Sequence, residues 1–138
     1  MKKIVIIGAG ISGLFFANLL RQNLDYDITI YEKNNSIKLE KGYGIQLSVN
    51  SIKLLNKIGF NNLNPKIKFN PIKLDFYSLK NKKKICDLNI SEFNTKDEKY
   101  TTLQRSVLTE FLKEKIPNNV IQYNKKIKQI DSKKETIK

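Results

Sequence analysis

Three glycines near the N-terminus have the spacing of a site for phosphate groups. The segment Gly8-Ala9-Gly10-Ile11-Ser12-Gly13 follows an apolar run and precedes a stretch with helical periodicity. In such a turn Gly8 lets the chain leave a strand sharply, Gly10 leaves room for a pyrophosphate, and Gly13 lets a helix pack closely on the sheet. The free N–H groups at the helix start and the positive end of its dipole then favour an anion.

An acidic residue completes this pattern. Glu32 ends a short β-prone run, Ile28–Tyr31, and it follows Gly13 at close to the spacing of about 20 residues that a dinucleotide-binding fingerprint requires. A carboxylate there accepts hydrogen bonds from a ribose 2′-hydroxyl and repels a 2′-phosphate. The sequence therefore predicts a dinucleotide site that prefers FAD or NAD to NADP.

The elements that position these residues form one βαβ unit. The apolar run Ile4–Ile7 predicts a first strand, the stretch from Ile11 to about Asn23 predicts a mostly buried helix, and Ile28–Tyr31 predicts a second strand. A helix between two strands is typical of a parallel sheet. We therefore expect the glycine turn and Glu32 to meet at the same edge of that sheet.

The remainder of the chain changes its hydrophobic period. A polar loop leads from Glu32 to Gly44, and alternating apolar residues over 72–90 predict an antiparallel hairpin that does not belong to a simple βαβ series. Further elements are expected: a helix from about Asn50 to Ile58 closed by Gly59, a short strand Tyr100–Leu103, a helix from about Arg105 to Ile116, a strand Val120–Tyr123, and the start of another strand at Ile127 and Ile130.

The composition limits the classes of partner. The 138 residues suffice for one domain with a core, and 26 Lys and Arg against 13 acids give a formal charge of +13. Such a charge is typical of proteins that bind nucleic acid or an anionic membrane. However, only Arg21 and Arg105 are arginines, and the lysines are scattered among Asn and Ile. This distribution is more typical of a compositional bias than of a surface that binds phosphates. We predict no nucleic-acid partner.

Location follows from the apolar start and the single cysteine. The uncharged stretch Ile4–Leu20 lacks a small-residue cleavage site, carries the fingerprint glycines and is shorter than the roughly 20 residues of a membrane-spanning helix, so no transmembrane segment is expected. Cys86 permits no intramolecular disulfide, and its alternating apolar surroundings predict a buried side chain. These features favour a cytoplasmic location.

Three blocks in order resemble a known family, the single-component FAD-dependent monooxygenases of the aromatic-ring hydroxylase and ubiquinone-biosynthesis hydroxylase type. The blocks run from Gly8 through Glu32 and Lys33, from Gly42-Tyr43-Gly44-Ile45 through Gly59, and from Gln104-Arg105 to Leu112. Together they are similar to the N-terminal part of that family and cover the whole chain. The series is far more specific than any single motif.

The resemblance implies roles for individual residues. It implies that Gly8, Gly10, Ile11, Ser12 and Gly13 hold the FAD pyrophosphate, that Glu32 takes the adenosine ribose with Lys33 beside it, that Gly44 allows close approach of its loop, and that Arg105 reaches the flavin side. A guanidinium is always charged and suits phosphate or ribityl oxygens. The sequence contains no His, no metal-ligand cluster and no nucleophilic triad, so no catalytic side chain or metal ligand is predicted.

The resemblance also implies a fold and an activity. The expected fold is a Rossmann-like α/β FAD-binding domain with a parallel sheet, in which 1–64 and 100–138 form the nucleotide-binding part and 65–99 is a hairpin excursion from the start of a substrate domain. In the family, NAD(P)H reduces FAD and a flavin C4a-hydroperoxide hydroxylates an organic substrate. Family members are more than twice as long and carry later cofactor-binding segments, so the chain is expected to be a truncated fragment whose activity alone stays open.

Other functions remain open at this point. The chain could be a non-catalytic nucleotide-binding module that needs a separately encoded C-terminal half, an FAD-dependent reductase or halogenase, or a basic nucleic-acid-binding protein. In the family's fold a later strand pairs with the strand at Ile4–Ile7, so we expect that strand to be an exposed apolar edge here. The substrate and the oligomeric state do not follow from the sequence.

Overall fold

The computed structural model describes residues 1–39, 43–131 and 136–137 and divides the chain into two compact units. The first unit comprises Met1–Glu40 and Ser106–Lys138, and the second comprises Lys41–Arg105. The sequence predicted that residues 1–64 and 100–138 form a nucleotide-binding part and that 65–99 form a hairpin excursion. That division stays a prediction. The two units are described separately below.

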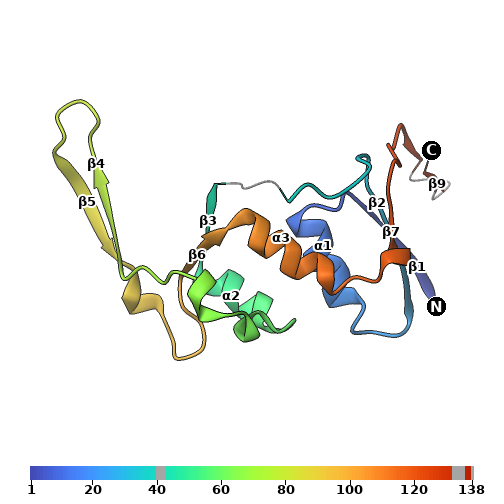
Figure 1. The fold of residues 1–138 in the computed structure, drawn as a ribbon, viewed down its shortest axis with the longest axis horizontal. Helices are drawn as coiled ribbons and strands as arrows, with labels where there is room; N and C mark the ends of the chain where they lie inside the picture. The colour runs from blue at the N-terminus through green and yellow to red at the C-terminus, as the bar shows by residue number, and fades with distance from the viewer. Residues whose placement is uncertain (40–42, 132–135, 138) are drawn as a thin grey trace. The chain divides into compact units, whose positions relative to one another are not determined.

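A parallel sheet forms the base of the first unit. Its strands β1 (Lys2–Ile7), β2 (Tyr26–Tyr31) and β7 (Ile121–Gln122) lie in the order β1-β2-β7 (Figure 1). β1 and β2 pair along their full length, whereas β2 and β7 pair over two residues. Parallel pairing of β1 with β2 across a helix confirms the predicted βαβ unit, and it places the ends of both strands at one edge.

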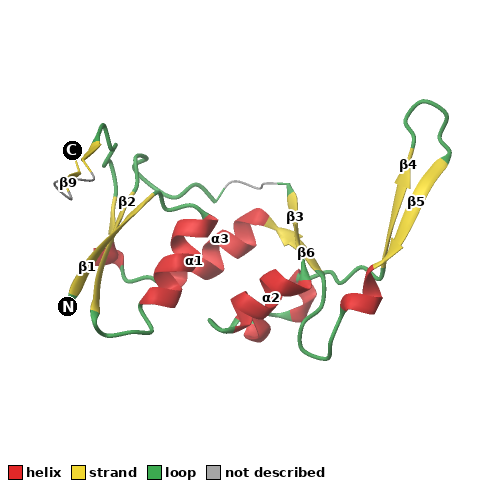
Figure 2. Cartoon of the chain, turned by 180° about the vertical axis from the view of Figure 1, so that it is seen from behind, coloured by secondary structure: helices red, strands yellow, loops and turns green. Residues whose placement is uncertain are grey.

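Two helices pack together in this unit. The first helix, α1 (Ile11–Leu20), lies beside α3 (Arg105–Glu114) in both views (Figures 1 and 2). Buried Asn18 joins them, because its Nδ2 donates to the carbonyl oxygens of Leu14 and Leu112 at 2.9 Å each. These bonds offset the cost of burying an amide. The least exposed apolar side chains of this unit are Leu14, Ala17, Ile30, Leu108 and Leu112.

The first helix is shorter than predicted. It ends at Leu20, three residues before the predicted end at Asn23. The side-chain oxygen of Asn23 accepts a hydrogen bond from the Asp25 N–H at 2.9 Å. Such a local bond competes with helical pairing and favours a turn, which brings the chain into β2.

The second unit contains a short antiparallel pair that was not predicted. β3 (Gly44–Leu47) pairs with β6 (Thr101–Gln104), whereas no strand was predicted over Gly44–Leu47. The described part of this unit also contains α2 (Val49–Asn56) and the 3-10 helices η1 (Phe60–Asn62), η2 (Pro65–Ile67) and η3 (Ile90–Phe93). Gly59 follows α2 with a φ of 84°, which confirms the predicted left-handed helix end.

The predicted hairpin is present in the second unit and has two unlike faces. β4 (Lys73–Tyr77) pairs with β5 (Lys84–Asn89), and the register sets Leu74 against Leu88 and Phe76 against Cys86 on one face. Cys86 is exposed, so the prediction that it is buried was wrong. Alternation identified the apolar face correctly, but no described element of this unit covers that face.

The opposite face of the hairpin is charged. Lys73 lies 2.9 Å from Asp87 and Lys84 lies 2.9 Å from Asp75, and Lys84 also contacts Asp87. Hydrogen bonds from Lys84 and Lys73 lower the pKa of Asp87 to about 2. Because all four side chains are well exposed to water, this network adds little to stability and mainly sets which face of the hairpin stays solvated.

Short elements complete the chain. η4 (Asn118–Val120) precedes β7, and β8 (Ile130–Asp131) pairs antiparallel with β9 (Thr136–Ile137). Within the described ranges, no helix combines the length and apolar composition needed to cross a lipid bilayer.

Candidate nucleotide-binding site

The glycine turn has the geometry that the sequence predicted. Gly8 has a φ of +97°, a conformation that side chains rarely adopt, and its N–H donates to the Tyr31 carbonyl oxygen at 2.8 Å. Gly10 is the N-cap residue of α1 and has ordinary extended backbone angles. A Cβ built on Gly10 would meet no atom within 4 Å. The space above Gly10 is therefore open to a ligand.

Gly13 is required for a different reason. A Cβ at this position would lie 2.1 Å from the Gly8 carbonyl oxygen and 3.3 Å from Cγ2 of Ile6. The first of these contacts involves backbone, which cannot move without displacing the turn. Only glycine lets α1 begin this close to β1, as the fingerprint predicts.

The start of α1 presents donors without a competing charge. The first intrahelical bond runs from the Leu14 N–H to the Gly10 oxygen at 2.9 Å, so the N–H groups of Ile11, Ser12 and Gly13 have no acceptor within the helix. No side chain caps this end, and the first turn contains no acidic residue. These donors and the helix dipole favour an anion at Gly10.

Glu32 connects the end of β2 to the glycine turn. Its carboxylate is buried, and Oε2 accepts a hydrogen bond from the Ala9 N–H at 2.9 Å. Oε1 accepts from the N–H of Asn34 at 2.9 Å and from its Nδ2 at 2.7 Å. The carboxylate therefore holds the turn in place even without a ligand.

The charge state of Glu32 follows from these contacts. Burial raises its pKa, but the hydrogen bonds from Asn34 and Ala9, with the nearby charge of Lys33, outweigh that effect and hold the pKa below its usual value. The carboxylate is thus ionised at neutral pH. A carboxylate offers about four acceptor positions, so Oε2 has acceptor capacity beyond its single bond to Ala9.

Two residues near Glu32 were missed by the sequence reasoning. Asn34 supplies both donors to Oε1. Tyr123 follows β7, and burial together with the charge of Glu32 raises the pKa of its phenol. The position of Tyr123 after a strand parallel to β2 was the available signal, because carboxyl ends of parallel strands share one edge.

The other predicted site residues fall into two groups. Lys33 is exposed next to Glu32 in the first unit, whereas Gly44 and Arg105 belong to the second unit. Gly44 pairs with Gln104, and the N–H of Arg105 donates to the Tyr43 oxygen at 3.3 Å. Gly44 and Arg105 are therefore neighbours. A Cβ on Gly44 would meet only ordinary contacts, the nearest at 3.7 Å. Gly42 lies outside the described residues.

Comparison with known proteins agrees with this geometry. Residues 6–38 match the family model of an NAD(P)-binding Rossmann-like domain, and this segment contains the glycine turn, α1, β2 and Glu32. No curated protein sequence matches the chain significantly.

Several solved structures share the fold. HpxO of Klebsiella pneumoniae, complexed with FAD and uric acid, matches with a TM-score of 0.73 and 19% identity over 94% of this chain and 32% of that chain. The 2,6-dihydroxypyridine-3-hydroxylase of Arthrobacter nicotinovorans matches with a TM-score of 0.73 and 17% identity, over 98% of this chain and 32% of that chain. The p-nitrophenol 4-monooxygenase PnpA of Pseudomonas putida matches with a TM-score of 0.71 and 17% identity, over 96% of this chain and 35% of that chain.

These matches confirm the predicted Rossmann-like fold. The chain spans about a third of the length of each of these proteins.

The two helix-start glycines are expected to respond differently to alanine. Gly13→Ala places a Cβ against backbone, so we expect the free energy of unfolding to fall by more than about 2 kcal/mol, the scale of overpacking. Gly10→Ala faces open space with ordinary backbone angles and is expected to cost less than about 1 kcal/mol. Urea denaturation followed by circular dichroism measures both, and equal losses would contradict the assigned roles.

Removal of Asn34 is expected to raise the pKa of Glu32. Asn34→Ala deletes the Nδ2 group that donates to Oε1 of Glu32. That hydrogen bond favours the charged form of the carboxyl group, so its loss raises the pKa. Because the pKa in the folded state lies below the unfolded value, Glu32 contributes stability at neutral pH that is lost as the pH falls through the folded pKa. The variant should lose that stability at a higher pH.

Carboxyl carbon NMR titration measures this shift directly. Asn35→Ala is the matched control, because Asn35 is exposed and its side-chain oxygen bonds Ser36 and not Glu32. An unchanged Glu32 titration in Asn34→Ala would show that Asn34 does not set the charge state.

Proposed function

We propose that the chain binds the ADP part of FAD through its first unit and contributes to a NAD(P)H-dependent flavin monooxygenase that hydroxylates an organic substrate. The observation that carries this proposal is the assembly of the open position at Gly10, the uncapped start of α1 and the ordered Glu32 carboxylate. Each of these features lies within one compact unit.

The residues present fit the two polar groups of the ADP part. The N–H groups of Ile11, Ser12 and Gly13 receive the pyrophosphate over Gly10, with Gly8 setting the turn. Oε2 of Glu32 accepts a ribose hydroxyl, with Lys33 beside it at the surface. The negative charge of Glu32 opposes a 2′-phosphate, which supports FAD or NAD over NADP at this site.

For the flavin side of the cofactor, the resemblance implies roles for Arg105 and Gly44. In this proposal Arg105 directs its donor fork to ribityl or phosphate oxygens, and Gly44 allows the loop before β3 to approach the cofactor. Bound FAD would supply the redox chemistry between NAD(P)H, O2 and the substrate. The residues of this chain bind and orient the cofactor, and none of them is assigned a covalent step.

The comparisons support a ring compound as substrate. The names of the three neighbours refer to uric acid, a dihydroxypyridine and a nitrophenol. A cytoplasmic location is part of the same proposal, because the exposed thiol of Cys86 would be prone to intermolecular pairing in an oxidising compartment.

FAD binding is the direct test. Purified protein should bind FAD, measured by flavin fluorescence, and ADP should compete while FMN, which lacks the adenosine half, should bind much more weakly. Gly10→Val fills the open position and should abolish retention. Glu32→Ala should weaken FAD binding about ten- to hundredfold, as expected for lost hydrogen bonds to a charged group. Glu110→Ala, which removes an exposed acid from α3, is the control. Protein that takes up no added FAD would overturn the proposal.

The free edge of β1 favours a second candidate, a nucleotide-binding module completed by another polypeptide segment. Lys2 and Gly8 donate toward β2, so the alternate backbone groups of Lys3, Val5 and Ile7 point away from it. Val5 is 40% exposed and Ile7 is 50% exposed on the sheet face that the described residues leave open. Parallel sheets are normally covered on both faces, and exposed apolar edges recruit further strands.

This candidate predicts a dependence on the second polypeptide. The isolated chain loaded with FAD should not consume NADPH under O2, whereas co-expression with a complementing segment should restore consumption. Val5→Asp with Ile7→Asp should prevent that restoration, because the charges would be buried beneath the covering segment. FAD binding by the isolated variant serves as the folding control. NADPH oxidation by the isolated chain would show that no partner is needed.

A further inference from the structure

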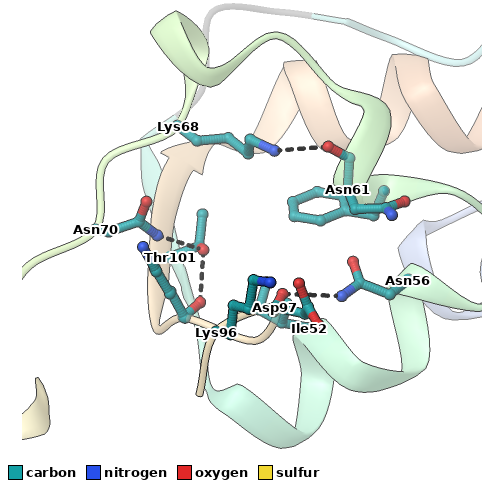
Figure 3. A pocket seen from close by; sticks show the side chains of 10 residues that line it. Ile52, Asn56, Asn61, Lys68, Asn70, Lys96, Asp97 and Thr101 are labelled. Atoms are coloured by element: carbon teal, nitrogen blue, oxygen red, sulfur yellow. Dashed lines mark hydrogen bonds between the residues drawn. The ribbon is translucent and has the colours of Figure 1, made fainter. Parts of the chain in front are cut away.

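A second candidate site lies in the second unit, separate from the glycine turn. A cavity of about 250 Å³ is bordered by the C-terminal end of α2, η1, the segment after η2 and the loop before β6 (Figure 3). Its floor contains the nearly inaccessible side chains of Ile52 and Phe60, so the surface offered to a ligand is mainly polar. The nucleotide proposal uses none of these residues.

The cavity has an excess of positive charge. Lys68, Lys96 and Lys99 line it together with a single carboxylate, that of Asp97. Among the described residues, none of these lysines lies within ion-pair distance of a carboxylate, whereas Lys73 and Lys84 on the hairpin are both paired. A pocket with three ammonium groups and one acid attracts an anionic ligand.

Lys68 is the best-positioned of the three ammonium groups. It is half-buried, its Nζ lies 5.3 Å from the centre of the Phe60 ring, and it donates a long hydrogen bond of 3.5 Å to the Asn61 oxygen. Burial lowers its pKa. An anion beside Lys68 would restore the stabilisation that the ammonium group loses through desolvation.

The opposite wall offers acceptors as well as charge. Asn56 donates from Nδ2 to the Asp97 carbonyl oxygen at 3.2 Å, and its Oδ1 is buried without a hydrogen-bond partner. Figure 3 shows Asn56 and Asp97 across the cavity from Lys68. Asn70 is ordered by bonds of 2.9 Å to the Tyr100 oxygen and to Oγ1 of Thr101. Amide and carboxylate acceptors suit the hydroxyl groups of a ligand.

We propose that this cavity binds a small hydroxylated phosphate ester, with the phosphate group at Lys68 and the hydroxyl groups at Asn56 and Asp97, while Lys96 and Lys99 add positive charge to the cavity. Ammonium groups bind phosphate as point charges and leave the orientation of the ester to the neighbouring hydrogen bonds. Inorganic phosphate would make the contacts of the phosphate group but not those of the hydroxyl groups. The site is independent of FAD, so its failure and that of the nucleotide proposal are distinguishable.

Titration of the full chain with glycerol 3-phosphate, inorganic phosphate and glycerol tests the proposal, with amide NMR shifts as the readout. Glycerol 3-phosphate should shift residues around the cavity and bind more tightly than inorganic phosphate, and glycerol alone should not bind. Equal affinity for inorganic phosphate would overturn recognition of an ester. Shifts that avoid the cavity residues would overturn the site itself.

Variants separate this site from general attraction to a basic protein. Lys68→Met should weaken glycerol 3-phosphate binding about tenfold, as the loss of one charged contact implies. Lys66→Met removes the same charge from an exposed position outside the cavity lining and should leave binding unchanged. Lys96→Met, in an exposed loop, gives a second test if Lys68→Met fails to fold. Equal weakening by Lys66→Met and the two cavity variants would overturn the proposal.

Discussion

The contact between Gly13 and the backbone of Gly8 is the constraint on which the candidate nucleotide site depends. Because no side chain separates them, α1 begins directly against the end of β1, and its unpaired N–H groups are delivered to the turn. The same turn is fixed to β2 by the bond from the Gly8 N–H to Tyr31. One steric requirement thus aligns a helix start, a strand end and an open position for an anion.

In the proposed function, Glu32 is a binding residue whose carboxylate is already ordered before a ligand is bound. A buried carboxylate is costly unless hydrogen bonds satisfy it, and Ala9 and Asn34 provide those bonds from both sides. They keep the group ionised and hold its orientation, so little ordering is left to occur on binding. The acid that recognises a ribose in this proposal is therefore also a structural link between β2 and the glycine turn.

The features that were predicted from the sequence are those with local causes. The spacing of Gly8, Gly10 and Gly13 and the alternation in the hairpin are properties of short segments, and the structure has both. β3 and the role of Asn34 depend on partners that are distant or on side-chain geometry, so no local pattern reveals them. Cys86 shows the same limit, because alternation identifies a face of a hairpin but not whether another layer covers it. The roles of Lys33, Gly44 and Arg105 still rest on resemblance.

Both units leave apolar surface exposed among the described residues, although the candidate site in the first unit is already ordered. The hydrogen bonds that order Glu32 and the glycine turn all lie within the first unit, so the proposed ADP site is ordered by residues of that unit alone. By contrast, Val5 and Ile7 on the sheet and Phe76 and Leu88 on the hairpin are apolar and at least two-fifths exposed. An isolated two-stranded hairpin is marginally stable in water, and a parallel sheet is normally covered on both faces. In the proposed function, binding of the ADP group is therefore physically separable from covering these apolar surfaces, since the former depends on residues that are already ordered and the described residues leave the latter exposed.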